Sequence, residues 1–315
     1  MKKYYGTTIF VVLLLSISAI GQQTEIRLQF SVLDEKNEAY KELKTDDIRI
    51  VVNQKPVQPR SLKPVSELPI EALVLIDASV SQTTVLPFGK QAAEYLINHI
   101  LTPGRDRVGI IKFSDNVSLF QDLTTDFAGA KSSLNAIHID IPPGYGGGIV
   151  VGPPPPLLDK TGSTSIFESI GTTISALAKV DAKGGRKMIV VISDGVNTSG
   201  ESKTDLIVEA AIKNGIKIYA VGIGDDFYDG VDEKSLKKLT EPTGGVFLKP
   251  NKTNTDLAEV MKKIENSLRF SYEVAIPDSA NDSSRMTKTV VEITNPQLKS
   301  RKLKIIQQKG IFPSP

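Results

Sequence analysis

Hydrophobic and polar residues alternate along the two ends of the chain in the rhythm of β-strands. Within residues 25–33 the apolar side chains Ile26, Leu28, Phe30 and Val32 occupy every second position, which predicts a half-buried strand. Residues 48–52 repeat this pattern near the N-terminus, and residues 272–276, 287–293 and 302–306 repeat it near the C-terminus. We therefore expect β segments at both ends, packed together as one small β unit.

The region between these segments follows a different pattern. Continuous apolar runs occur at residues 73–76, 108–113, 188–192 and 218–223, and the last two are typical of strands buried on both faces of a parallel sheet. Helical spacing appears at 206–211, closed by Gly215, and at 257–268. The pattern predicts an α/β fold with a doubly wound, mostly parallel sheet over residues 70–268, flanked by β segments at 22–69 and 269–315.

Two stretches rich in proline interrupt these patterns. The first contains Pro56, Pro59, Pro64 and Pro69 and is read as a polar connection. The second, PPGYGGGIVVGPPPP at residues 142–156, has a composition that forms neither a helix nor a central strand. Composition alone favours a surface loop there.

The first residues predict export from the cell. Lys2 and Lys3 precede a mostly apolar stretch at residues 9–20, and the small residues Ala19 and Gly21 fit a cleavage site after Gly21. This is typical of a secretory signal peptide covering residues 1–21. The alternative is an uncleaved anchor, although the apolar stretch is shorter than the about 20 residues that span a bilayer. With no cysteine in the chain, we expect bacterial export to the periplasm or the medium, without disulfides and without a membrane span after cleavage.

Charge and motif content exclude several classes of function. The formal net charge is +2, and removal of Lys2 and Lys3 leaves a balanced chain, which gives no reason to expect nucleic acid as a partner. The only histidines are His99 and His138, and neither has a suitably spaced companion. The metalloprotease, nucleophile-elbow and phosphate-loop motifs are missing, so we expect no enzyme activity.

Small oxygen-bearing residues follow two of the predicted strands and precede a predicted helix. The run ALVLIDASVS ends on Asp77, Ser79 and Ser81, the run MIVVISDG ends on Asp194, and Thr164 lies in the Gly/Ser-rich stretch TGSTS. Open α/β sheets bind their ligands at the carboxyl ends of their strands, so we expect these residues at one edge of the sheet. The alternative interpretation is that the two aspartates only cap helices.

This combination resembles the von Willebrand factor type A domain with its metal-ion-dependent adhesion site. The family pattern DxSxS, threonine and aspartate is matched at all of its positions. The segments VGIIKFSDNV and IYAVGIGDD also look like strands of that family, and the resemblance covers residues 70 to about 268. Val80 and Gln82 depart from the DxSGSM form of many members, and we expect neither change to affect a donor. The chain ends, including RKLKIIQQKGIF, are similar to exported "VWFA-related" proteins of acidobacteria.

The resemblance implies a metal site and a protein partner. Asp77, Ser79, Ser81, Thr164 and Asp194 would hold Mg²⁺, with Mn²⁺ or Ca²⁺ as alternatives, because such hard cations prefer oxygen ligands. An Asp or Glu carboxylate of a protein partner would complete the metal shell, which makes the chain an exported, non-enzymatic binding module. We expect the 142–156 segment to help select the partner through Tyr145, Ile149, Val150 and Val151.

Two other interpretations stay open at this point. A structural or assembly protein could use the same fold without a functional metal and would bind its partners equally well in the presence of chelator. A metal-assisted hydrolase needs a general base near the ion, and the sequence offers no good candidate.

Overall fold

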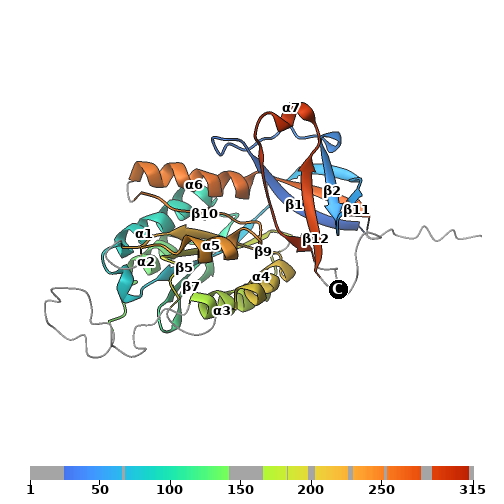
Figure 1. Cartoon of the computed structure of the whole chain (residues 1–315). Coiled ribbons are helices and arrows are strands. Elements are labelled where there is room, and N and C mark those ends of the chain that lie inside the picture. The colour runs from blue at the N-terminus through green and yellow to red at the C-terminus, as the bar shows by residue number, and fades with distance from the viewer. Residues whose placement is uncertain are drawn as a thin grey trace, which may run out of the picture.

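A six-stranded sheet forms the centre of the protein (Figure 1), which is described here by a computed structural model of residues 25–65, 68–141, 166–182, 184–197, 203–225, 230–251, 254–277 and 286–311. In spatial order its strands are β10 (Phe247–Leu248), β9 (Ile216–Gly222), β8 (Arg186–Ser193), β5 (Ile70–Asp77), β6 (Arg107–Phe113) and β7 (Val117–Thr124). All neighbouring pairs are parallel except β6 and β7. The predicted mostly parallel sheet is confirmed.

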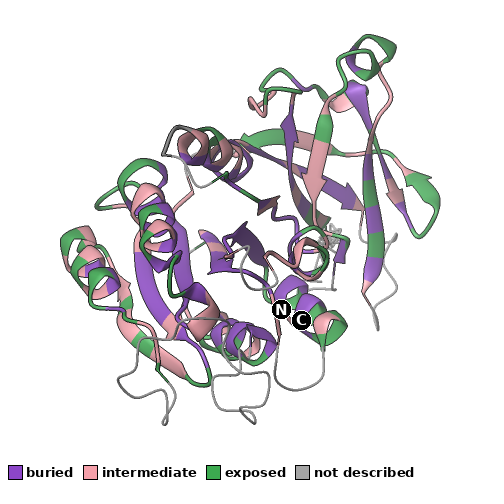
Figure 2. Ribbon diagram, turned by 60° about the vertical axis from the view of Figure 1, so that its left-hand side comes forward, coloured by how far each residue is buried: buried purple, intermediate pink, exposed green. Residues whose placement is uncertain are grey.

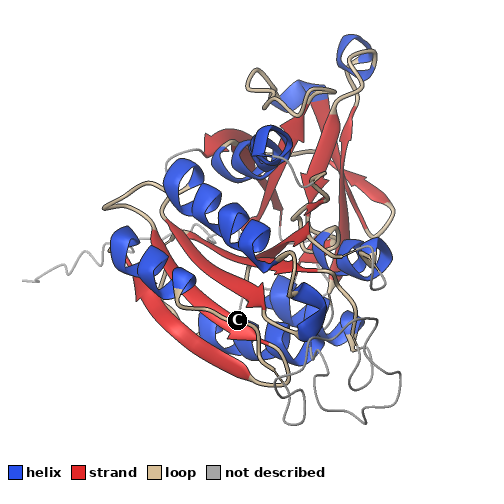
Figure 3. Ribbon diagram, turned by 90° about the vertical axis from the view of Figure 1, so that its left-hand side faces the viewer, coloured by secondary structure: helices blue, strands red, loops and turns tan. Residues whose placement is uncertain are grey.

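Helices cover both faces of this sheet, as the layers in Figure 3 show. One face packs against α1 (Leu86–Tyr95, continued by a π-helical turn at Leu96–Ile100), α2 (Phe127–Asn135) and α6 (Asn254–Arg269). The other face packs against α3 (Ile166–Ala178), α4 (Thr204–Lys213) and α5 (Glu233–Thr240). Every residue of β5 and β9 is buried (Figure 2), because helices exclude water from both sides of these strands. The doubly wound α/β class follows directly from this arrangement.

The two ends of the chain together form a pair of smaller sheets. The strands of the first, in spatial order, are β13 (Lys304–Gln307), β1 (Glu25–Leu33), β11 (Ser271–Pro277) and β4 (Ser61–Val65). Those of the second are β14 (Gly310–Ile311), β12 (Thr287–Ile293), β2 (Ile48–Val52) and β3 (Lys55–Val57). Apolar residues from both sheets, among them Phe30, Ile50 and Val274, share one core. Each sheet thus mixes N-terminal and C-terminal strands.

Short helical segments complete the chain. They are a 3-10 turn at Thr45–Asp47, a second 3-10 turn at Val80–Gln82 and the helix α7 (Pro296–Lys299). In the part of the chain that the structure describes, no helix has the length and apolar character needed to cross a membrane.

Two local expectations from the sequence were wrong. The proline-rich connection contains the strands β3 and β4, which carry Pro56 and Pro64 and lie at sheet edges, where a missing backbone N–H is tolerated. The last long strand begins at Lys304 rather than at residue 302, because Lys302 has a positive φ of 50° and belongs to a turn.

Hydrogen bonds, some of them buried, fasten the small sheets to the central sheet and its helices. The Arg186 guanidinium donates to the carbonyl oxygens of Leu268 and Val65, so the start of β8 is joined to the ends of α6 and β4. The Ser31 hydroxyl donates to the carbonyl oxygen of Ser267 at 2.6 Å, and the Lys309 amide donates to that of Pro242 at 2.7 Å. These contacts join the small sheets to the start of β8, to the C-terminal part of α6 and to the turn after α5.

Candidate metal centre

Asp77 and Asp194 lie side by side at the carboxyl edge of the central sheet. β5 and β8 are parallel neighbours in which Ile76 pairs with Ile192, so the residues that follow these two positions leave the sheet together. Asp77 is the last residue of β5, and Asp194 comes directly after β8. Their residues are only 1% and 2% exposed. Two buried carboxylates thus share one site, as the sequence predicted.

A continuous chain of hydrogen bonds connects the predicted donors. Asp77 Oδ1 accepts hydrogen bonds from the Ser79 amide at 3.0 Å and from the Ser79 hydroxyl at 2.6 Å. The hydroxyl oxygens of Ser79 and Ser81 are 3.1 Å apart, and the Ser81 hydroxyl donates to Asp194 Oδ2 at 2.7 Å. The structure therefore brings together four of the five residues expected to hold a metal.

The remaining predicted site residues lie outside the described part of the chain. These are the fifth metal donor, the expected partner-contact residues and the signal segment: Thr164, Tyr145, Ile149, Val150, Val151 and residues 1–21. Asp140, two residues before the 142–156 segment, is placed: its amide donates to the carbonyl oxygen of Ala78 at 2.9 Å. Its carboxylate accepts from Lys112 Nζ at 2.6 Å and from the Ser114 hydroxyl at 2.5 Å. Asp140 therefore lies beside the Asp77 turn.

Two residues of the site were missed by sequence reasoning. Gln82 Nε2 donates to Asp194 Oδ2 at 2.8 Å, so the expectation that this departure from the family pattern affects no donor was wrong. The Ser193 hydroxyl donates to Asp77 Oδ2 at 2.6 Å. Ser193 could have been identified from the sequence, because it immediately precedes Asp194 at the end of a buried strand. Gln82 had none, because its partner is 112 residues away in sequence.

The helix-cap interpretation of the aspartates is not supported. The N-cap of α1 is Val85 and that of α4 is Lys203, and neither makes a side-chain cap hydrogen bond. Asp77 and Asp194 instead accept the amides two residues ahead, those of Ser79 at 3.0 Å and Val196 at 2.9 Å. Such local bonds stabilise the turns in which the carboxylates lie.

The two carboxylates repel each other in a buried environment. Burial raises the pKa of Asp77 to about 7, and the negative charge of Asp194 contributes in the same direction. Hydrogen bonds from Ser193 and Ser79 oppose this rise. A cation between the carboxylates would remove the repulsion, because a nearby positive charge favours the ionised form of both.

The loop that carries Asp194 is held against α5. Gly195 has a φ of 79°, and a Cβ at this position would come within 2.7 Å of Leu236 Cγ. The Asp232 amide donates to the carbonyl oxygen of Asp194 at 2.7 Å. Asp232 also caps α5 by accepting the amide of Ser235 at 3.0 Å. The position of Asp194 is therefore fixed by the start of this helix.

The donor set fits a hard divalent cation. Among the described residues, no group of three or more carboxylate and imidazole side chains gathers at one point, so the hydroxyls of Ser79 and Ser81 are needed as neutral donors beside the two aspartates. Carboxylates and hydroxyls are oxygen ligands of the kind that Mg²⁺, Mn²⁺ and Ca²⁺ accept, whereas soft metals prefer sulfur. The residues present are therefore compatible with Mg²⁺.

Comparisons with known proteins identify the type of domain. Two family models of the von Willebrand factor type A domain match the chain, one at residues 73–197 and the other at residues 157–263. A protein of Borreliella burgdorferi, described as "Uncharacterized protein", is 23% identical over 247 residues. That match covers 71% of this chain and 62% of the relative, so the chain spans less than two thirds of the relative's length.

Solved structures with similar folds come from several organisms. BatB from Bacteroides thetaiotaomicron is 20% identical with a TM-score of 0.45 and covers 62% of this chain and 97% of its own. A von Willebrand factor type A protein from Catenulispora acidiphila is 11% identical with a TM-score of 0.47. The match covers 93% of this chain and 75% of the chain from Catenulispora acidiphila. Proximal thread matrix protein 1 from the mussel byssus is 15% identical with a TM-score of 0.47, and its structure is described as having a zinc-occupied MIDAS motif. The match covers 69% of this chain and 49% of the mussel protein.

The two family matches together run from residue 73 to residue 263, which is the doubly wound part of the structure and includes both site aspartates. The chain therefore contains a von Willebrand factor type A domain.

Proposed function

We propose that the protein is an exported, non-enzymatic module that binds another protein through a metal ion. The observation that carries this proposal is the unbroken run of oxygen atoms from Asp77 through Ser79 and Ser81 to Asp194 at the open edge of the sheet. Thr164, which follows Gly162 and Ser163, is proposed as a further donor.

The chemistry of the donors explains why a partner carboxylate would bind. Asp77 and Asp194 provide negative charge, and the two serines add neutral oxygens, which reduce the Lewis acidity of the ion less than further carboxylates would. A Mg²⁺ ion bound there would retain affinity for one more anionic oxygen, which an Asp or Glu side chain of the partner supplies. Mn²⁺ and Ca²⁺ accept the same kind of ligand.

The other parts of the proposal rest on the sequence. The basic and apolar N-terminus supports export to the periplasm or the medium. The absence of a paired histidine or other general base motif supports a binding role rather than hydrolysis. Tyr145 and residues 149–151 are proposed as partner contacts, because they follow closely in sequence after Asp140, whose amide is bound to Ala78 next to Asp77.

One observation favours a second function, that of an assembly protein without a metal. Gln82 and Ser81 both donate to Asp194 Oδ2, so neutral groups already satisfy part of this carboxylate. A domain that uses these hydrogen bonds only to hold its loops would bind partners in the presence of chelator.

The proposal is tested by asking whether a carboxylate ligand reaches the metal. Mn²⁺ is bound to the protein, and the relaxation rate of water protons is measured while a glutamate-containing peptide is added. We expect the relaxation rate to fall, because the carboxylate displaces metal-bound water. A matched peptide with glutamine in place of glutamate serves as the control. Equal effects of the two peptides, or tight partner binding in chelator, would favour the assembly function.

A further inference from the structure

A groove lined with lysine residues runs along α5 and reaches the junction between the central sheet and the small sheets. Its wider part, a pocket of about 740 Å³, lies between the starts of α4 and α5 and the Lys309 turn. Its inner part, a pocket of about 500 Å³, lies between α5, α6, β10 and β13. Both pockets are lined by Lys237 and Glu241, so they are two parts of one groove.

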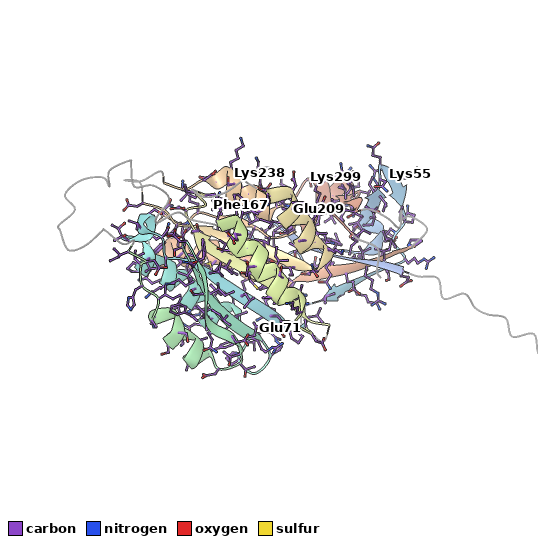
Figure 4. The ribbon with its side chains drawn as sticks, turned by 90° about the horizontal axis from the view of Figure 1, so that it is seen from below. Lys55, Glu71, Phe167, Glu209, Lys238 and Lys299 are labelled. Atoms are coloured by element: carbon purple, nitrogen blue, oxygen red, sulfur yellow. The ribbon has the colours of Figure 1, made fainter. Side chains whose placement is uncertain are left out.

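The groove is positive although the chain as a whole is balanced. Its lining contains three acidic residues, Asp205, Glu233 and Glu241. Against these stand six lysines, namely Lys234, Lys237, Lys238, Lys263, Lys304 and Lys309. In the full chain, by comparison, 38 basic residues face 36 acidic ones. Lys238 extends from α5 away from the body of the protein (Figure 4).

Most of the groove lysines are not neutralised by an ion pair within the described structure. Glu233 pairs with Lys237 Nζ at 2.9 Å and with Lys249 Nζ at 3.1 Å, so one carboxylate is shared by two ammonium groups. Within the described part of the chain, the other five groove lysines form no ion pair. The groove therefore has ammonium groups available for an external anion.

Lys263 places a partly buried positive charge at the inner pocket. Its side chain on α6 is half-buried, and burial lowers the pKa of Lys263. The positive charges of Lys304 and Lys237 lower this pKa further, against an opposing effect of Glu241. Three cations are thus held close together around a cavity, and an anion placed among them would relieve their repulsion.

The floor of the inner pocket is apolar. Phe247 of β10 and Ile306 of β13 line it and are each only partly buried, whereas the neighbouring Ile305 side chain packs against the core of the small sheets. A highly charged polymer such as polyphosphate would gain nothing from such a floor. A peptide with alternating acidic and apolar side chains would use both features, because burying apolar area contributes about 25 cal/mol per Å².

We propose that this groove is a second binding site that takes an acidic, partly apolar peptide segment of a partner protein. Lys263 and Lys304 bind its carboxylates, and Phe247 and Ile306 contact its apolar side chains. The site is distinct from the metal centre and requires no metal. It extends along α5, whose first turn is fixed to the Asp194 loop, so a long ligand follows this helix toward the metal edge.

The probe is a fluorescent peptide of alternating glutamate and leucine, titrated with the full mature protein in EDTA while its anisotropy is measured. We expect saturable binding that weakens with added salt, since exposed charges are screened over about 10 Å at 0.1 M ionic strength. Replacing the leucines of the peptide by serine should weaken binding further. Because chelator is present, loss of the proposed metal function would not change this result.

Two double variants make the test specific. Lys263→Gln with Lys304→Gln should weaken binding about fivefold to thirtyfold, the loss of two charge contacts. Lys55→Gln with Lys299→Gln removes the same charge from exposed positions on β3 and α7 and should leave binding unchanged (Figure 4). Equal weakening by both pairs, or no binding at all, would overturn the proposal. So would polyphosphate that binds more tightly than the peptide with the same lysine dependence.

Discussion

The parallel strands of the central sheet end at a carboxyl edge, where the strands finish, and begin at an amino edge on the opposite side. Charged side chains have different surroundings at these two edges. At the carboxyl edge, Asp77 and Asp194 accept hydrogen bonds mainly from hydroxyl, amide and loop backbone groups. At the amino edge, the guanidinium groups of Arg186 and Arg269 donate to backbone carbonyls and, for Arg269, also to Asp106. The carboxyl edge holds the buried carboxylates of Asp77 and Asp194 without a guanidinium partner in the bonds given above, whereas at the amino edge two guanidinium groups lie near the buried carboxylate of Asp106.

The difference separates a binding edge from a structural edge. The donors at the carboxyl edge are neutral and come from loops or, for Ser193, from the last residue of β8, so a cation can take over these carboxylates without breaking the sheet. At the amino edge each cation holds a fixed backbone group of another element, such as the carbonyl oxygen of Ile100 that Arg269 Nε reaches at 3.0 Å. Changes at the amino edge should therefore lower stability, whereas changes at the carboxyl edge should alter metal binding.

The largest effect on stability is expected from Arg269→Ala. This change removes the most buried guanidinium partner of Asp106, which is 0% exposed, and leaves the more exposed Arg105, whose Nε lies 3.4 Å from Asp106 Oδ1. Breaking a buried ion pair on one side costs about 3–5 kcal/mol, so the free energy of unfolding measured in urea should fall by this amount. The control is Arg49→Ala, whose ion pair with Glu292 is exposed and should contribute less than about 1 kcal/mol. Similar losses for the two variants would contradict the structural role of the amino edge.

A smaller effect, of opposite sign, is expected from Lys217→Met. Burial, together with the charge of Arg186, lowers the pKa of Lys217 to about 8, and its Nζ has no hydrogen-bond partner among the described residues. Methionine removes this buried charge, so the free energy of unfolding at pH 7 should rise by up to about 3 kcal/mol.

The stability gained by Lys217→Met should depend on pH. Between pH 8 and pH 10.5 the folded protein binds fewer protons at Lys217 than the unfolded chain does, so the stability of the unmodified protein rises with pH in this window. Urea unfolding at pH 7 and pH 10 should therefore show that the advantage of Lys217→Met shrinks at the higher pH. An equal advantage at both values would show that Lys217 carries no unfavourable charge.

The smallest effect is expected from Gln82→Leu at the carboxyl edge. Leucine removes the amide that donates to Asp194 Oδ2, so this oxygen becomes more available to a cation. A hydrogen bond to a charged group is worth about 1.5 kcal/mol, and Mg²⁺ should bind about threefold to tenfold more tightly. The control is Gln297→Leu, an exposed position on α7. Weaker Mg²⁺ binding by Gln82→Leu would mean that the amide positions Asp194 for the metal instead of competing with it.

The sequence predicted the carboxyl edge well because its signal is local. An apolar run that ends on Asp77, and a second that ends on Asp194, places both residues at strand ends, and parallel strands bring their ends together. The small sheets were harder to predict because their pairing is distant in sequence, as between Ile26 and Ile276. Two-residue strands such as β10 and β14 have too few positions to show any periodicity.

The central claim is that Asp77 and Asp194 form a cation site, and a calorimetric titration with Mg²⁺ tests it most directly. The mature protein should bind about one ion per chain, and Asp77→Asn, which preserves the side-chain shape, should weaken binding at least about tenfold. Asp126→Asn is the matched control, since Asp126 only caps α2 through the amides of Ala128 and Gly129. Equal Mg²⁺ binding by all three proteins, or none by the unmodified protein, would contradict the account.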